Sequence, residues 1–433
     1  MKVESEELRY DQFMEKVAKK LAFTHKKSER EQVVIKAIDE VYPGLSMEEK
    51  VDRMQRFLSY DVVDEYMNDP ATEDIMINGV GPIFVFNSKE GMIKTGRRFR
   101  SEEELDRFIS KLLLFSDRPT QDREPIMNLH LPEGGRVNIA QSPFGHQITI
   151  RKFRQKPMSV INLIELGTLD FELAAQFWLY SEGLSVKPAN ILIGGMPSSG
   201  KTTLLNALFS FFRPNERVIV IEDTMELNTS QNENCARLEA TGDLTLGELV
   251  KNSLRMRPDR IVIGEVRGNE ANDLMTAMNI GKIGMGTIHA SNARELVMRL
   301  ENTPMNVPSE VIPLIDVFII VKRYYINNRM FRVVSQVSET GGVEKKVLLS
   351  DLCVYDLKTG KMSEIHPSVI YRDRLSQAAG VTPKEIMDEI TLRTEVLKAL
   401  AKKNIKTIED ISAFCAHYYD NPNEALEEIK FRD

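Results

Sequence analysis

One stretch of this chain constrains its fold more than any other feature. Residues 190–205 read NILIGGMPSSGKTTLL. An apolar run at 191–193 predicts a short buried strand, and the apolar residues after Thr202 predict a helix. Between them, residues 195–202 fill the pattern G-x-x-x-x-G-K-[ST] without a gap. The alternative is a chance Gly/Ser turn, which would not need a strand before it and a helix after it. Strand, loop and helix in this order therefore indicate a P-loop.

The chemistry of this loop predicts a site for ATP with Mg²⁺. A glycine-rich loop turns its backbone N–H groups toward phosphates, and the helix N-terminus adds a partial positive charge. Lys201 can reach the β- and γ-phosphates, while the Thr202 hydroxyl suits Mg²⁺. The residues expected to hold the nucleotide are Gly195, Pro197, Ser198, Ser199, Gly200, Lys201, Thr202 and Thr203.

Composition narrows the class of protein. A chain of 433 residues is long enough for two or three domains. Its net charge of −7 argues against a dedicated nucleic-acid binder. Cys235, Cys353 and Cys415 are too far apart to indicate a disulfide framework or a zinc site, and reduced thiols fit a cytoplasmic protein. No apolar run approaches the roughly 20 residues that span a bilayer, so we expect membrane contact to be peripheral and through partners.

The pattern of apolar and turn-forming residues divides the chain into five predicted parts. We expect a helical N-terminal extension at 1–58, a mixed α+β domain at 59–154, a linker at 155–159, the nucleotide-binding domain at 160–372 and a helical tail at 373–433. Strands alternating with helices after residue 190 predict a largely parallel sheet. The tail has capped amphipathic helices but no phosphate or metal motif, so we expect it to serve partner docking or ring assembly.

Two acidic positions follow strand-like runs of the nucleotide-binding domain. Glu222 comes directly after 218–221, and Glu265 follows 261–263 closely. Open α/β sheets gather their ligands at the carboxyl ends of strands, so Glu265 is expected to orient the attacking water. Gly264 stands where many P-loop proteins have an aspartate. Support for the metal is therefore expected from Thr202, through water, or from the acidic cluster of Glu222, Asp223 and Glu226. Helix capping after the strand is the alternative role of Glu222 and Asp223.

Histidine and arginine supply the remaining candidates. His289 follows a glycine-rich segment at the end of a further predicted strand; it is either a buried structural histidine or a sensor of the γ-phosphate. Arginines beside turns suit phosphate contact, with ordinary surface pairing as the alternative. Those expected to approach the phosphates are Arg136, Arg151 and Arg154, and their rivals, which flank the Glu265 strand, are Arg255, Arg257 and Arg267.

Four ordered motifs together resemble the secretion-ATPase superfamily of type II and type IV secretion systems, type IV pili and archaella. That family has a Walker A loop, an Asp box, an atypical Walker B and a His box. Here they look like residues 195–202, 221–227, 257–268 and 281–290. The similarity extends upstream through 134–138 and 148–153, and so covers roughly residues 60 to 370.

The resemblance implies a homo-hexameric ring ATPase. Each subunit would join a PAS-like N-terminal domain to a RecA-like core, with ATP between them. ATP turnover would drive a polytopic platform protein of the cytoplasmic membrane that assembles a filament or exports proteins. By motif match, Glu265 looks like the catalytic acid, Glu222 like the Asp-box acid and His289 like the His-box histidine. Mg²⁺ would be held by Thr202, Glu222 and Glu265.

Two departures from the family pattern stand out. Lys282 occupies the place of a second His-box histidine, and the four-cysteine zinc insertion of bacterial pilus ATPases is absent from the sequence. The missing insertion favours the archaeal, tight-adherence or conjugation branches. The helical tail, with Arg393 and the segment 418–422, looks most like archaeal pilus or archaellum ATPases.

Two other functions compete with a secretion motor. A RecA-like nucleic-acid translocase would need basic pore loops and a steep negative dependence of binding on salt. A nucleotide-gated scaffold would bind ATP and barely hydrolyse it, against which Lys201 and Glu265 argue. We expect no nucleic-acid partner.

Overall fold

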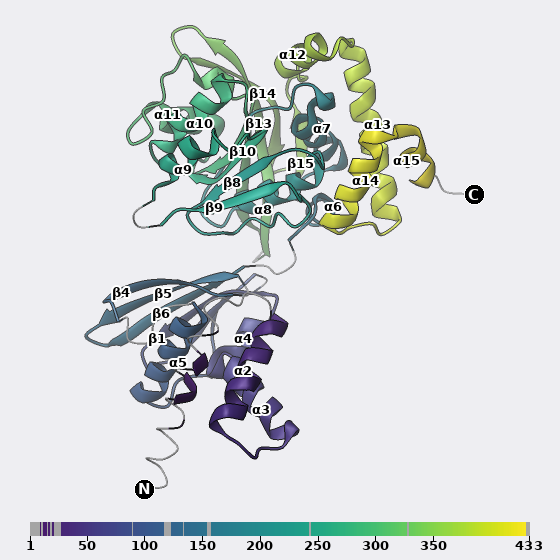
Figure 1. The fold of residues 1–433 in the computed structure, drawn as a ribbon. Helices are drawn as coiled ribbons and strands as arrows, with labels where there is room; N and C mark the ends of the chain where they lie inside the picture. The colour runs from purple at the N-terminus through teal and green to yellow at the C-terminus, as the bar shows by residue number, and fades with distance from the viewer. Residues whose placement is uncertain are drawn as a thin grey trace. The chain divides into compact units, whose positions relative to one another are not determined.

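The computed structural model describes residues 27–88, 90–116, 123–132, 134–153, 157–241, 244–326 and 329–429, together with residues 9, 12–14, 16, 17 and 20. The chain forms two compact units, residues 1–155 and 156–433 (Figure 1). The finer division into five parts stays a prediction.

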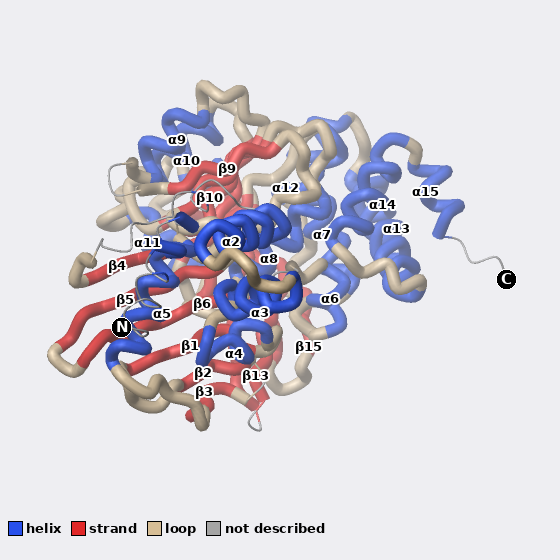
Figure 2. The backbone as a smooth tube through the Cα atoms, turned by 60° about the horizontal axis from the view of Figure 1, so that its bottom comes forward, coloured by secondary structure: helices blue, strands red, loops and turns tan. Residues whose placement is uncertain are grey.

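The first unit is built on a six-stranded antiparallel sheet of order β3-β2-β1-β6-β5-β4 (Figure 2). Its strands are β1 Thr72–Asn78, β2 Phe84–Asn87, β3 Gly91–Lys94, β4 Ile126–His130, β5 Gly135–Ser142 and β6 Gly145–Lys152. The described helices are α2 Lys27–Val41, α3 Met47–Leu58, η1 Asp61–Val63, α4 Asp64–Asn68 and α5 Glu102–Phe115.

Alternating side chains of this sheet bury one face against the helices. Ile75 and Ile77 of β1 and Ile148 and Ile150 of β6 lie in one hydrophobic cluster with residues of α2, α3 and α5. A period of two is what one buried face of an antiparallel sheet requires. The capping box at Ser46 predicts the start of α3 correctly: its hydroxyl accepts a hydrogen bond from the Glu49 N–H.

The second unit is built on a nine-stranded sheet of order β15-β14-β13-β12-β7-β11-β10-β8-β9. Its strands are β7 Ile191–Gly195, β8 Val218–Glu222, β9 Cys235–Glu239, β10 Arg260–Val266, β11 Ile283–Ile288, β12 Val317–Ile326, β13 Arg329–Val343, β14 Val347–Asp356 and β15 Lys361–Glu364. Pairing is parallel from β12 through β9 and antiparallel from β12 to β15. The predicted α/β class and parallel core are confirmed.

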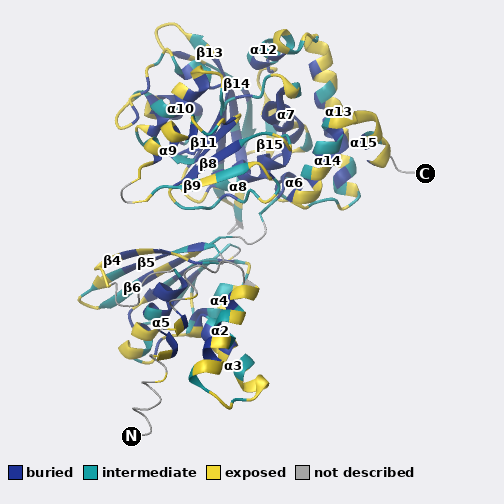
Figure 3. Cartoon of the chain, in the orientation of Figure 1, coloured by how far each residue is buried: buried dark blue, intermediate teal, exposed yellow. Residues whose placement is uncertain are grey.

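Helices cover both faces of the parallel part (Figure 1). They are α6 Val160–Glu165, α7 Phe171–Glu182, η2 Gly183–Ser185, α8 Lys201–Leu208, η3 Phe209–Phe211, α9 Leu246–Ser253, α10 Glu270–Asn279, α11 Ala293–Glu301 and η4 Ile312–Leu314. Ile191 and Ile193 of β7 point into one hydrophobic cluster, with α7 and α8, while Leu192 points into the other, with α9–α11. Burial on both faces explains the unbroken apolar run of this strand. The labelled strands β8 and β11 of the same sheet are buried likewise (Figure 3).

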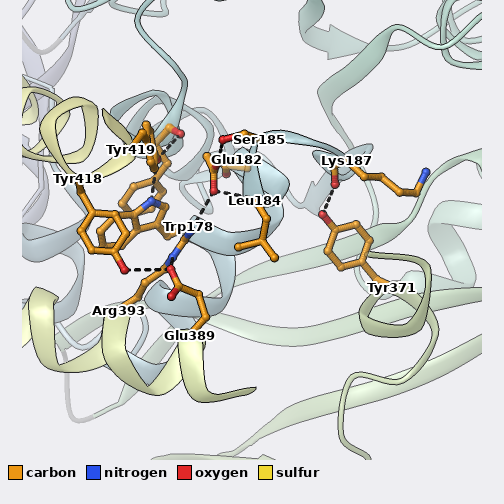
Figure 4. A network of polar contacts seen from close by, with 12 residues as sticks. Trp178, Glu182, Leu184, Ser185, Lys187, Tyr371, Glu389, Arg393, Tyr418 and Tyr419 are labelled. Atoms are coloured by element: carbon orange, nitrogen blue, oxygen red, sulfur yellow. Dashed lines mark hydrogen bonds and ion pairs between the residues drawn. The ribbon is translucent and has the colours of Figure 1, made fainter. Parts of the chain in front are cut away.

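The C-terminal helices pack on the core of the second unit. They are α12 Ile370–Ala379, α13 Pro383–Lys402, α14 Ile408–Asp420 and α15 Pro422–Ile429. Their apolar side chains share the hydrophobic cluster of α7 and α8. Beneath them, Arg393 of α13 binds Glu182 at 3.0 Å and Glu389 at 2.7 Å, and its guanidinium lies 4.8 Å from the centre of the Trp178 ring (Figure 4).

In the described part of the chain, no helix combines the length and the apolar character needed to cross a bilayer. The three cysteines, Cys235, Cys353 and Cys415, are free thiols.

Candidate functional site

The P-loop connects β7, the middle strand of the nine-stranded sheet, to α8. Gly195 ends the strand, and a Cβ atom there would lie 2.3 Å from Ser199 Oγ and 2.6 Å from the carbonyl oxygen of Val321. Gly200 precedes α8 with φ +102°, a left-handed conformation that glycine adopts without strain. The two glycines of the motif are therefore required by packing at one end of the loop and by backbone conformation at the other.

Lys201 begins α8 and turns back over the loop. Its side chain is largely buried, and Nζ lies 3.4 Å from the Met196 carbonyl oxygen and 3.2 Å from His289 Nδ1. The other ring nitrogen of His289, Nε2, lies 2.5 Å from Glu265 Oε1. Residues from three separate motifs thus meet at the carboxyl ends of β7, β10 and β11.

Glu265 is surrounded by positive groups. Arg267 donates a short hydrogen bond to its carboxylate and also pairs with Asp223 at 3.3 Å. Burial alone would raise the pKa of Glu265, but the hydrogen bond from Arg267 and the charges of Arg267 and Lys201 outweigh it, so the pKa lies below its usual value. Glu265 is therefore an ionised acceptor at neutral pH, as a group that orients a water must be.

Glu222 lies beside this group but is held differently. Its Oε1 accepts hydrogen bonds from the backbone N–H groups of Glu226 at 3.0 Å and Leu227 at 3.1 Å. Burial raises the pKa of Glu222 to about 7. A Cβ atom on Gly264 would lie 2.9 Å from Glu222 Cγ. The glycine that stands in place of an aspartate thus makes room for Glu222.

The loop residues fit a nucleotide and its Mg²⁺. Ser199 Oγ is buried, and no hydrogen-bond partner is present for it among the described residues. Nor do the described residues contain a cluster of three His, Cys, Asp or Glu side chains that would hold a metal by themselves. Mg²⁺ is commonly held by one or two protein oxygens together with phosphate oxygens and water. Thr202, in the first turn of α8, is placed to supply such an oxygen.

The structure brings together some of the predicted residues and not others. Arg136 on β5 and Arg151 on β6 are cross-strand neighbours in the first unit, and Arg151 lies 4.0 Å from Asp74. Arg154 lies outside the described residues. The rivals Arg255 and Arg257 precede β10, at the amino end of the parallel strands, whereas Arg267 follows its carboxyl end. Of these three rivals, only Arg267 reaches the P-loop edge.

Lys282, the departure in the His box, lies away from the site. It precedes β11, while His289 follows the same strand. At about 3.3 Å per residue, the two ends of this strand are separated by roughly 20 Å. The lysine therefore leaves the contacts of His289 unchanged.

One site residue was missed in the sequence. Arg332 of β13 donates from Nε to the Ser198 carbonyl oxygen in the P-loop at 3.0 Å. Nothing near Arg332 in the sequence resembles a nucleotide motif, and the two residues are brought together by the pairing of β13 with β12 and of β12 with β7.

A family model described as "Type II/IV secretion system protein" matches residues 59–336, more than half of the chain. The chain belongs to this family. It is 44% identical over 230 residues to the uncharacterized protein MJ0781 of Methanocaldococcus jannaschii, covering 50% of this chain but only 32% of that protein. It is 32% identical over 374 residues to MJ0900 of the same organism, an uncharacterized protein, covering 83% of this chain and 67% of that one.

Among solved structures, the Legionella pneumophila ATPase DotB is similar with a TM-score of 0.48 and 20% identity, over 84% of this chain and 94% of that one. The match of the family model confirms the resemblance drawn from the four motifs at the level of the type II/IV secretion family. The Methanocaldococcus relatives fit its archaeal branch.

Proposed function

We propose that this chain is the ATP-hydrolysing subunit of a homo-hexameric motor that drives type IV pilus-like or archaellum-like filament assembly, or protein secretion. The observation that carries the proposal is the contact series from Lys201 through His289 to Glu265 beside the P-loop. These contacts bring Lys201, His289 and Glu265 together at one edge of the sheet, which supports the roles that we propose for them. Family membership supplies the secretion context.

In this proposal each group has one task. The P-loop N–H groups and Lys201 bind and orient the phosphates, and Thr202, with Glu222 and Glu265 nearby, holds Mg²⁺ directly or through water. Mg²⁺ supplies charge neutralisation at the β- and γ-phosphates. Glu265 orients the attacking water, and His289 reports the state of the γ-phosphate to its neighbours. An arginine lowers the barrier by stabilising charge that develops on the transferred group.

The test separates binding from turnover. Lys201→Ala removes the phosphate contact, so the affinity for ATP should fall. Glu265→Gln keeps the shape but orients water poorly, so ATP should still bind while Mg²⁺-dependent turnover falls by at least about 100-fold. Lys282→Ala, at the far end of β11, is the matched control and should keep both. Normal turnover in Glu265→Gln would overturn the assignment. DNA-stimulated turnover in the unmodified protein would instead favour the translocase.

Cooperation around the ring is a second part of the proposal. Arg154→Ala, and to a lesser degree Arg151→Ala, should bind ATP nearly normally and turn over poorly, because an arginine at the γ-phosphate is worth about 10³ to 10⁵ in rate. Titrating either variant into unmodified subunits should depress the ATPase rate by more than the variant's mole fraction. A straight line would mean independent sites, and full activity of both pure variants would remove these arginines from the mechanism.

The proposed partner is a polytopic protein of the cytoplasmic membrane, with the motor peripheral on the cytoplasmic side. Affinity capture from native membranes, followed by identification of the bound polytopic protein, tests this. The purified chain should stay unbound in the presence of neutral liposomes, and tight binding to them without a partner would contradict the proposal.

A further inference from the structure

The hairpin formed by β12 and β13 lies directly against the P-loop. Val321 of β12 is paired in register with Gly195, the first glycine of the loop, and Val334 of β13 is paired with Val321. Arg332 is two residues before Val334 on β13. This antiparallel hairpin thus continues the sheet at the point where the P-loop leaves it.

The hairpin touches the loop at three positions. The Val321 carbonyl oxygen is 2.6 Å from the place where a Cβ of Gly195 would be. The Arg332 Nε donates to the Ser198 carbonyl at 3.0 Å. Arg332 Cδ is 3.4 Å from the place of a Cβ on Gly200, so the aliphatic stem of this arginine packs on the loop backbone. One side chain therefore binds both the apex of the loop and its final glycine.

The peptide that Arg332 binds is held from two directions. Ser198 has φ +58°, a left-handed conformation that a residue with a side chain adopts only when its surroundings hold it there. Its carbonyl oxygen accepts from Arg332, while the N–H at the other end of the same peptide, that of Ser199, donates to the Met196 carbonyl at 3.1 Å. Because a peptide unit is rigid and planar, these two bonds together set its orientation.

We propose that Arg332 is a positioning residue of the nucleotide site: it holds the apex of the P-loop in its phosphate-binding shape and adds a permanent positive charge beside it. This inference rests on the proposed ATPase function and deepens it. A guanidinium stays protonated at every physiological pH. A P-loop contacts the phosphates in the ground state and in the transition state alike, so Arg332, which acts through the shape of the loop, is expected to favour nucleotide binding more than the chemical step.

The experiment compares three substitutions at Arg332 with one at Arg323. Arg323 is the cross-strand partner of Arg332, and its guanidinium lies 5.4 Å from the Tyr325 ring centre, which makes Arg323→Ala the matched control. The measurements are the dissociation constant of a fluorescent ADP, the KM for ATP, kcat and the melting temperature without nucleotide. Arg332→Ala should weaken ADP binding and raise KM about tenfold, corresponding to the loss of one charge-assisted hydrogen bond, with kcat within about threefold of the unmodified value.

The conservative variants separate the contribution of the positive charge to ADP affinity from that of the hydrogen bond to the Ser198 carbonyl. Arg332→Lys keeps the charge, and Arg332→Gln keeps a donor for the Ser198 carbonyl, so each should restore part of the affinity. Unchanged ADP affinity in Arg332→Ala, or an equal loss in Arg323→Ala, would overturn the proposal. If Arg332→Ala melts well below the unmodified protein, Arg332→Lys decides: reduced affinity with unchanged melting supports the role, and unchanged affinity removes it.

Failure of the proposed function would look different. If the unmodified chain binds no nucleotide, the ATPase proposal falls as a whole. If the unmodified chain and Arg332→Ala bind ADP equally well, only the role of Arg332 falls.

Discussion

The charged side chains at the P-loop edge of the second unit and those beneath its C-terminal helices differ in how they meet solvent. At the P-loop edge, Arg267 is 55% exposed where it pairs with Glu265, which is itself only partly covered. Beneath the helices, Arg393 and Glu182 are 3% and 2% exposed. Both clusters join an arginine to two carboxylates, so composition does not distinguish them.

The difference lies in what holds each charge. Glu182 accepts from the Leu184 N–H at 3.1 Å and the Ser185 hydroxyl at 2.8 Å as well as from Arg393 (Figure 4). Among the described residues, the contacts of Glu265 come from the side chains of Arg267 and His289. Side-chain pairs near solvent can be exchanged for phosphate and water at little cost, whereas a buried charge cannot lose its partner cheaply. The arrangement at Glu265 suits a site where ligands exchange, and the arrangement at Glu182 suits a permanent structural contact.

The largest effect on stability is expected from breaking the buried ion pair of Arg393 and Glu182. Arg393→Ala leaves Glu182 buried without its counter-charge, which typically destabilises by about 3–5 kcal/mol. Chemical denaturation should show this loss as a lower midpoint. Lys398→Ala, which removes an exposed pair with Glu395 on the same helix, is the control and should cost less than about 1 kcal/mol. Equal losses of unfolding free energy in the two variants would mean that this ion pair does not anchor the C-terminal helices.

A pH dependence sharpens the comparison at Glu222. Its pKa of about 7 is above the ordinary value of 4.5, so the folded protein keeps a proton that the unfolded chain releases between these values. This contribution to stability is complete below pH 4.5 and is lost as the pH rises through 7. The free energy of unfolding, relative to that of the non-titrating variant Glu222→Gln, should fall by up to about 3 kcal/mol over this range.

The measurement for Glu222 is denaturation of both proteins from about pH 4.5 to 8. Glu395→Gln, at an exposed position of α13, serves as the control and should run parallel to the unmodified protein. Parallel curves for Glu222→Gln as well would show that folding leaves the pKa of this carboxyl unchanged.

A smaller effect is expected from one hydroxyl of the tail. Tyr419 accepts from the Trp178 indole N–H at 2.6 Å and donates to the Phe211 carbonyl at 2.9 Å. Tyr419→Phe leaves these two groups unpaired and should cost about 1–3 kcal/mol. Phe211 ends the segment that follows α8. Because Trp178 is the other group left unpaired, its fluorescence during unfolding reports the same contact. A stability equal to that of the unmodified protein would mean that water replaces the hydroxyl.

The smallest effect on stability is expected at the P-loop edge itself. Arg267→Ala removes an exposed partner of Glu265 and Asp223, so the free energy of unfolding should change by less than about 1 kcal/mol. Because exposed charges are screened, this difference should shrink further in about 1 M salt. A loss comparable to that of Arg393→Ala would erase the distinction between the two clusters.

Local patterns in the sequence predicted a large part of the fold. The patterns Ser46–Glu49 and Thr382–Glu385 in the sequence predict two capping boxes, and these begin α3 and α13. The acids at 222 and 265 do lie at carboxyl ends of parallel strands. In the sequence, the glycine pair at 341–342 predicts a break between two strands, and that prediction is wrong. β13 continues through it to Val343, with a bulge at Thr340–Gly342 and φ +119° at Gly342.

What the sequence by itself determined are features that depend on neighbours a few residues apart: the P-loop between its strand and helix, the caps, and the order of the four motifs. Which charges meet was decided only by the tertiary structure. Arg332 reaches Ser198 across 134 residues, and Arg393 reaches Glu182 across 211. Such pairs follow from strand order and helix packing, because a side chain finds its distant partner only when the whole sheet has placed the two backbones within reach.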